Sequence, residues 1–196
     1  MSRATISIPG EHRFTVQDYY RMGEVGIIPP DQKTELIDGK VVYMTPPGPG
    51  HSGTVLLIDR AFEGLGKRVI VSAQNPLRVD SHNEPQPDVA VLRPRDDFYT
   101  ETHPKPADVL LVIEVSDSSL LKDTKVKRPK YAEAGIVEYW IVDLNFRCVH
   151  VCREPQGKEY RSIRKVSRGT IAPLAFPDYA VKVADLLPPR RPAKRG

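Results

Sequence analysis

The sequence has no apolar run long enough to cross a membrane. A helix that spans a bilayer needs about 20 consecutive apolar residues, whereas the apolar run that begins at Val109 stops at Glu114. Residues 1–10 also lack the apolar core of a secretory signal. We therefore expect a cytoplasmic protein that does not interact with a membrane.

Cysteine is scarce, with only Cys148 and Cys152 in the chain. Both fall in an alternating segment, 147–153, that is typical of a strand, where four residues separate Cα atoms by about 13 Å. A disulfide needs Cα atoms within about 7 Å, so we expect two free thiols. The five histidines form no close pair suited to zinc.

Positive charge is only in small excess. The formal net charge is +4, and four cations lie in the last seven residues, at Arg190, Arg191, Lys194 and Arg195. The remaining chain is close to neutral, so the overall charge is no evidence for DNA binding. The segment 122–130 is better evidence, because its five cations and one acid could contact phosphates.

A length of 196 residues and a hydrophobic content of 40% are ordinary for one compact soluble domain. No internal repeat or second core is visible, so residues 1–187 are expected to form a single domain. Residues 188–196 are a basic, proline-rich tail, for which we expect disorder. An accessory contact of this tail with nucleic acid or lipid head groups is the alternative.

Two apolar segments each carry one acid. Residues 109–116 are β-branched and apolar except for Glu114, a pattern that favours a buried strand over a helix. Residues 88–92 form a second strand pattern that begins at Asp88. An ionised acid inside a strand of this kind must be paired or bound to a cation.

A simple register brings the two acids together. If the strands are antiparallel neighbours with Leu92 opposite Leu110, then Asp88 lies opposite Glu114. Opposed side chains share a face of the sheet, with Cβ atoms about 5 Å apart. Mg²⁺ prefers one or two carboxylates together with water and phosphate oxygens. The sequence therefore predicts an acidic metal site on this pair of strands.

Several further motifs follow one another in order along most of the chain. They are residues 35–40 (ELIDGK), Pro46-Pro47 with His51, residues 86–88 (QPD), residues 113–120 (IEVSDSSL), Asp123 with Lys127, residues 131–136 (YAEAGI) and residues 138–143 (EYWIVD). Each motif alone is weak, but their order and spacing together are specific. In these motifs the sequence resembles the Uma2 family of restriction-endonuclease-like proteins, within the PD-(D/E)XK nuclease superfamily.

The resemblance implies an α/β fold with a restriction-endonuclease-like core, in which helices flank a central mixed β-sheet. It also implies hydrolysis of phosphodiester bonds in DNA, by an endonuclease in preference to an exonuclease. The implied cofactor is Mg²⁺, with Mn²⁺ as a substitute. By motif matching, Asp88 and Glu114 are metal ligands, and Glu35 is a third acid from the N-terminal part.

The catalytic lysine departs from the superfamily's usual pattern. An E-x-K motif places the lysine two residues after the glutamate, where this chain has Ser116. In the Uma2 pattern the lysine corresponds to Lys127. The resemblance therefore implies that Lys127 orients the nucleophile or stabilises the transition state.

Each assignment has an alternative. Asp88 and Glu114 could belong to a structural ion pair, Glu35 could be a solvated acid beside a hairpin, and Lys127 could lie on a solvated charged face. His51 could face the site, or could serve a helix cap or a loop. The whole protein could be a catalytically silent nucleic-acid-binding or assembly module, or a hydrolase of another phosphoester. A homodimer would supply the two sites that double-strand cleavage needs, although no residue indicates one.

Local patterns predict the element order. Thr15 is a suitable N-cap for a short helix over 15–22, and Asp38-Gly39 suits a type I′ turn in a hairpin over 35–44. A helix is expected over 52–65 and another from Pro129 to Ala134. Strands are expected over 68–72, 77–79, 88–92, 109–116, 137–144 and 147–153. The long polar loop 93–107 could overhang the site.

Overall fold

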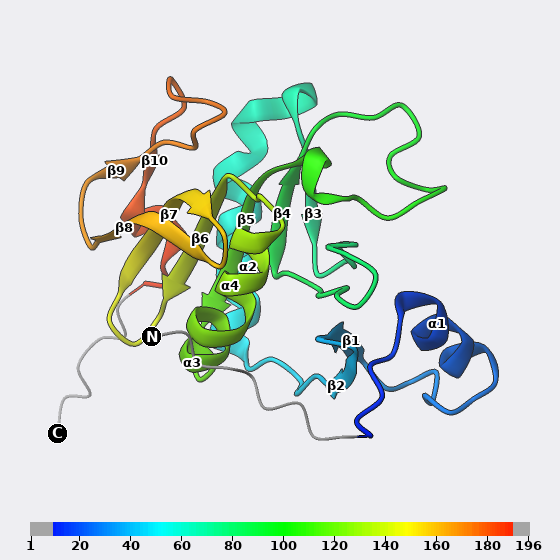
Figure 1. Cartoon of the computed structure of the whole chain (residues 1–196). Helices are drawn as coiled ribbons and strands as arrows, with labels where there is room; N and C mark the ends of the chain where they lie inside the picture. Colours follow the sequence, from blue (N-terminus) through cyan, green and yellow to red (C-terminus); the bar gives the residue numbers. More distant parts are fainter. Residues whose placement is uncertain (1–9, 190–196) are drawn as a thin grey trace, which may run out of the picture.

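A six-stranded mixed sheet organises the protein (Figure 1). The structure, a computed structural model, describes residues 10–189. The strands lie in the order β3-β4-β5-β6-β7-β8, and all neighbours are antiparallel except β5 and β6, which are parallel. The predicted α/β class with a central mixed sheet is confirmed. The cations of the predicted tail, from Arg190 onward, lie outside the described residues.

The elements have the following bounds. The strands of the main sheet are β3 (Ile70–Ala73), β4 (Val89–Leu92), β5 (Val109–Ser116), β6 (Glu138–Asp143), β7 (Cys148–Gln156) and β8 (Glu159–Val166). Two small sheets pair β1 (Thr34–Ile37) with β2 (Lys40–Tyr43) and β9 (Thr170–Ile171) with β10 (Val181–Lys182). The helices are α1 (Val16–Glu24), α2 (Pro49–Phe62), α3 (Leu120–Lys122) and α4 (Arg128–Glu133), with a π-helical turn at Asp123–Lys127 and 3-10 turns at Glu63–Arg68, Pro106–Asp108 and Val183–Leu186.

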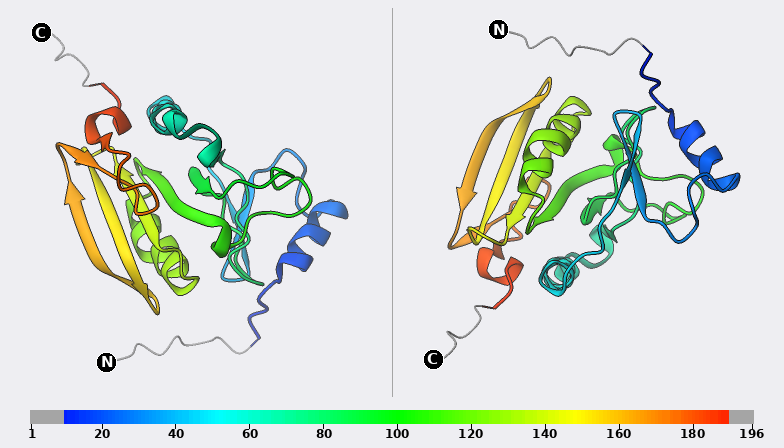
Figure 2. Two further views of the ribbon diagram at one scale, coloured as in Figure 1. Left: turned by 90° about the horizontal axis from the view of Figure 1, so that it is seen from above. Right: turned by 90° about the horizontal axis from the view of Figure 1, so that it is seen from below.

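Both faces of the sheet are covered. Figure 2 shows α2 on one face and α4 on the other. Phe62 of α2 packs with Trp140 in the first hydrophobic core, and Tyr131 of α4 packs with Tyr139 in the second. Trp140 and Tyr139 are fully buried. Because successive strand residues point to opposite faces, β5 and β6 read as nearly continuous apolar runs.

The predicted pairing of β4 with β5 is confirmed for most of its length. Val89 lies opposite Ile113, and Val91 lies opposite Leu111, as the register that joins Asp88 to Glu114 requires. At the far end the register shifts by one residue, so that Leu92 faces Val109 and not Leu110. This irregularity lies away from the acids and leaves their relation unchanged.

The helix that carries Lys127 is longer than the sequence pattern indicates. It begins at Leu120 and continues through the π-helical turn into α4, whereas the sequence places its start at Pro129. Proline has no N–H, and inside a helix its ring clashes with the carbonyl four residues earlier. The wider turn just before Pro129, where the Arg128 N–H bonds to the carbonyl of Asp123, lets the helix continue through this position.

One other expectation about the fold is wrong. Residues 77–79 form no strand, although Leu77 and Val79 are buried. Their backbone N–H groups bond to Pro85 and Asn83 of a neighbouring loop, which satisfies them without a sheet.

The hairpin of β1 and β2 forms at the predicted place, and it lies beside α1 (Figure 1). Asp38 and Gly39 both have positive φ, as a type I′ turn requires. Thr15 caps α1, and it shares a reciprocal capping box with Asp18. No helix in residues 10–189 is both long enough and apolar enough to cross a membrane.

We predict that Gly39→Ala destabilises the protein more than Gly26→Ala does. Both glycines have positive φ, at 71° and 75°, so each alanine should cost about 1 kcal/mol of backbone strain. A Cβ at Gly39 would also lie 2.7 Å from the Arg13 Cβ and 2.9 Å from the Phe14 nitrogen, while none of these close contacts exists at Gly26. Urea unfolding of the two variants measures the difference, and equal losses would contradict the packing of residues 13–14 on the hairpin.

Candidate active site

The four residues predicted for the site line one pocket of about 440 Å³. It lies where the β1–β2 hairpin, the start of α2 and the helix from Leu120 meet the edge formed by β4 and β5. Its polar lining includes Glu35, Gln86, Asp88, Glu114, Asp123 and Lys127. No residue of the loop 93–107 lines this pocket, so the expectation that this loop overhangs the site is wrong.

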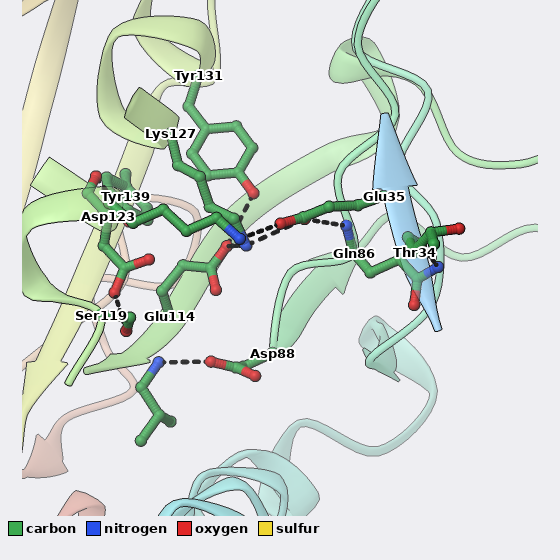
Figure 3. A network of polar contacts seen from close by, with 12 residues as sticks. Thr34, Glu35, Gln86, Asp88, Glu114, Ser119, Asp123, Lys127, Tyr131 and Tyr139 are labelled. Atoms are coloured by element: carbon green, nitrogen blue, oxygen red, sulfur yellow. Dashed lines mark hydrogen bonds and ion pairs between the residues drawn. The ribbon is translucent and has the colours of Figure 1, made fainter. Parts of the chain in front are cut away.

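Glu114 and Lys127 form a buried ion pair at the base of the pocket (Figure 3). The Lys127 ammonium donates to Oε1 of Glu114 at 2.8 Å, and both residues are at most 5% exposed. The Tyr131 hydroxyl donates to the same oxygen at 2.9 Å. Burial raises the pKa of Glu114 well above its ordinary value, and the charges of Asp88 and Asp123 add to this, although Lys127 opposes them.

Glu35 reaches the same lysine from the hairpin. Its Oε2 lies 3.5 Å from the Lys127 ammonium and accepts the backbone N–H of Gln86 at 3.3 Å, while its Oε1 pairs with Lys122. Burial alone would raise the pKa of Glu35, but the charge of Lys127 and the hydrogen bond from Lys122 outweigh it and lower that pKa. Glu35 is therefore ionised and fully engaged with two lysines.

Asp88 is held from two sides. Its Oδ2 accepts the backbone N–H of Val115 at 2.8 Å and lies 3.1 Å from Nε2 of His51. Burial would raise the pKa of Asp88, but the bond with His51 and that from Val115 prevail and lower it. His51 lines the pocket and therefore faces the site. It lies in the first turn of α2, so the alternative that it belongs to a loop is wrong.

Two carboxylate oxygens in the pocket have no hydrogen bond from any residue in the range 10–189. They are Oδ1 of Asp88 and Oε2 of Glu114, while the second oxygen of each carboxylate is bonded as described above. Figure 3 shows Asp88 and Glu114 facing the same space. Neither oxygen is among the buried atoms that lack a partner, so both are open to the pocket, where a cation could bind them.

The sequence pattern did not assign Asp123 and Tyr131 to the site. Asp123 is buried in the pocket wall and accepts a hydrogen bond of 2.6 Å from the Ser119 hydroxyl. Burial raises the pKa of Asp123. Asp123, Lys127 and Tyr131 follow one another at intervals of four residues, which is the spacing of one helix face. This spacing was visible, but the helix was expected to begin only at Pro129.

A model of the Uma2 family, described as "Putative restriction endonuclease", matches residues 16–184. The chain belongs to this family. A crystal structure from Anabaena variabilis, described as "a putative nuclease belonging to DUF820", is similar in fold to this Uma2 protein, with a TM-score of 0.69 and 17% sequence identity. The match covers 88% of this chain and 97% of the other. None of the curated proteins matches the chain.

We predict that Lys127→Met lowers the free energy of unfolding by about 3 kcal/mol, because the substitution leaves Glu114 and Glu35 buried without their shared counterion. Lys125→Met is the matched control. It lies in the same π-helical turn but is exposed, so its effect should stay within about 0.5 kcal/mol. Chemical denaturation followed by circular dichroism measures both, and a small loss for Lys127→Met would show that the buried pair is not formed in solution.

Proposed function

We propose that this Uma2-family protein is a metal-dependent DNA endonuclease that uses Mg²⁺, with Mn²⁺ as a substitute. The observation that carries the proposal is the pair of carboxylate oxygens, on Asp88 and Glu114, that face the pocket without a partner beside the buried ammonium of Lys127. Family membership supports a nuclease, and the residue types at the site fit the chemistry of phosphodiester cleavage.

Asp88 and Glu114 would hold the metal. Two carboxylates without a full protein cage match the preference of Mg²⁺ for a few acids, with water and phosphate oxygens at the other positions. A bound Mg²⁺ would polarise the phosphoryl group and lower the pKa of water. The resemblance also implies direct ligation by Glu35. Because both oxygens of Glu35 bond to lysines or to Gln86, we propose that Glu35 acts mainly by holding Lys127.

Lys127 would supply positive charge to the scissile phosphate. Burial would lower its pKa, but the charges of Glu114 and Glu35 overcome this effect and raise the pKa above its ordinary value. The side chain therefore stays an ammonium and cannot serve as a general base near neutral pH. Stabilising the negative charge that develops on the phosphoryl oxygens is the role that a fixed ammonium can fulfil.

His51 and Lys122 would prepare the site for substrate. His51 fixes one oxygen of Asp88, which leaves the other directed to the pocket. Lys122 is part of the pocket wall and is partly exposed, so its ammonium can meet a backbone phosphate of DNA. Cleavage of both strands would require a second site, and the homodimer that could supply it remains a prediction.

We predict weak binding of Mn²⁺ to the wild-type protein and a large loss of binding in Asp88→Asn/Glu114→Gln. Isothermal titration calorimetry measures the affinity, and the melting temperature should rise with Mn²⁺ much more in the wild type than in the double variant. Asp178→Asn, which changes an exposed acid outside the pocket, is the control and should bind as the wild type does. An unchanged affinity in the double variant would remove the proposed metal site.

We further predict that Lys127→Gln lowers the turnover of plasmid DNA by about 100-fold in the presence of Mg²⁺, the loss typical for one electrostatic stabiliser. Glutamine can still bond to Glu114, so metal affinity should change little. Lys125→Gln, next to it on the exposed side, should retain turnover within a factor of a few. An equal loss in both variants would mean that the basic segment only binds DNA diffusely. Absence of cleavage by the folded, metal-bound wild type would favour the silent binding module.

A further inference from the structure

A second group of metal-binding side chains lies outside the proposed nuclease site. Asp143, Cys148 and His150 each offer one donor atom, and these atoms all lie within 4.8 Å of one another. All three residues are at most 5% exposed. The group was not expected from the sequence, because it joins three different residue types from two strands.

The strand register explains why these residues meet. In the antiparallel pair of β6 and β7, Asp143 lies directly opposite Cys148. His150 follows Cys148 by two residues and so points to the same face of the sheet. Opposed residues and their diagonal neighbours on one face lie within reach of each other's side chains. The three donors therefore come together on rigid backbone close to the β6–β7 turn, and no loop has to move to assemble them.

The distances suit a small cation of intermediate softness. In a tetrahedral zinc site, bonds of 2.0 to 2.3 Å place neighbouring ligand atoms about 3.3 to 3.8 Å apart. Nε2 of His150 already lies 3.3 Å from Oδ2 of Asp143. The Cys148 sulfur has at most about 1 Å to travel, which a small side-chain rotation can provide. One thiolate, one imidazole and one carboxylate form a donor set that favours Zn²⁺ over Mg²⁺.

We propose that Asp143, Cys148 and His150 form a second metal site, for Zn²⁺ or a similar divalent transition metal, with water as the fourth ligand. The ion would join β6 to β7 beneath the helix that carries Lys127. The proposal does not depend on the nuclease function, because none of the three residues lines the pocket that contains Asp88 and Glu114.

An unpartnered hydroxyl beside this group supports a polar ligand there. In the parallel pair of β5 and β6, Ser116 is the register partner of Asp143, so a polar row runs from Ser116 through Asp143 to Cys148. Ser116 is fully buried, and its Oγ has no hydrogen-bond partner among the described residues. Buried hydroxyls rarely lack a partner. The Asp123 carboxylate is also near, because the Ser116 side chain lowers its pKa, so the water ligand of a bound ion is one of two groups that could satisfy this hydroxyl.

The test is a titration of the untagged, chemically reduced full-length protein with Co²⁺, which reports thiolate ligation by its absorption. We expect one equivalent of Co²⁺ to produce a thiolate-to-cobalt band in the near ultraviolet, which Zn²⁺ removes and excess Mg²⁺ does not. Cys148→Ser should lose the band. His150→Gln should weaken Co²⁺ binding by about 100-fold or more, since even changes beyond the ligands themselves cost 10- to 100-fold.

Cys152→Ser is the matched control. Cys152 lies on the same strand and face as Cys148 and is also buried, but it does not belong to the group. This variant and Asp88→Asn should both keep the band. A wild-type protein without a thiolate band, a band that survives in Cys148→Ser, or a band lost in Cys152→Ser would each overturn the proposal. If Cys148→Ser does not fold, unchanged Co²⁺ affinity in the folded His150→Gln variant would do the same.

Discussion

The buried ammonium of Lys127 is the interaction on which the arrangement of the site depends. It contacts Glu114 on the central strand β5 and Glu35 on the separate β1–β2 hairpin, and it is itself part of the helix over the sheet. Three elements that are distant in the sequence thus share one counterion. Because removal of one partner leaves buried charge uncompensated, the hairpin, the strand and the helix are coupled electrostatically. Any function of the pocket therefore depends on the hairpin, the strand and the helix together.

The charges in the pocket explain why a protein would retain such a costly arrangement. Glu35, Asp88, Glu114 and Asp123 are all buried, and Lys127 is the only buried lysine among the described residues. A core built for stability alone would do as well or better with apolar side chains of similar size. Burial raises the pKa of Glu114, and the charges of Asp88 and Asp123 add to this effect although Lys127 opposes them. A cation that binds the free oxygens of Asp88 and Glu114 would favour the ionised form of Glu114, which connects the buried acids to the proposed use of the site.

The sequence was most informative where a local rule acts alone. The capping box at Thr15 and the turn at Asp38-Gly39 follow from neighbouring residues, and the assumed pairing of β4 with β5 is the simplest register of two adjacent strand patterns. Asp88 and Glu114 could be placed for the same reason. The predictions that were wrong share another cause, because tertiary contacts determine the structure of those segments. The segment 77–79 is buried by a loop without pairing in the sheet, and the early start of the helix before Pro129 depends on packing against β5 and β6.

The π-helical turn resolves a geometric difficulty in the site. In an α-helix, a residue four positions on is rotated by about 40° beyond a full turn, so Asp123, Lys127 and Tyr131 would fan out by about 80°. The looser winding of the π turn between Asp123 and Lys127 takes back much of the first rotation. Asp123 and Lys127 can then line one pocket while Tyr131 still reaches Glu114. The same π-helical turn also accommodates Pro129. One irregularity of the backbone therefore has two effects, because it lets the helix continue past the proline and aligns the polar face of the helix with the acids of the sheet.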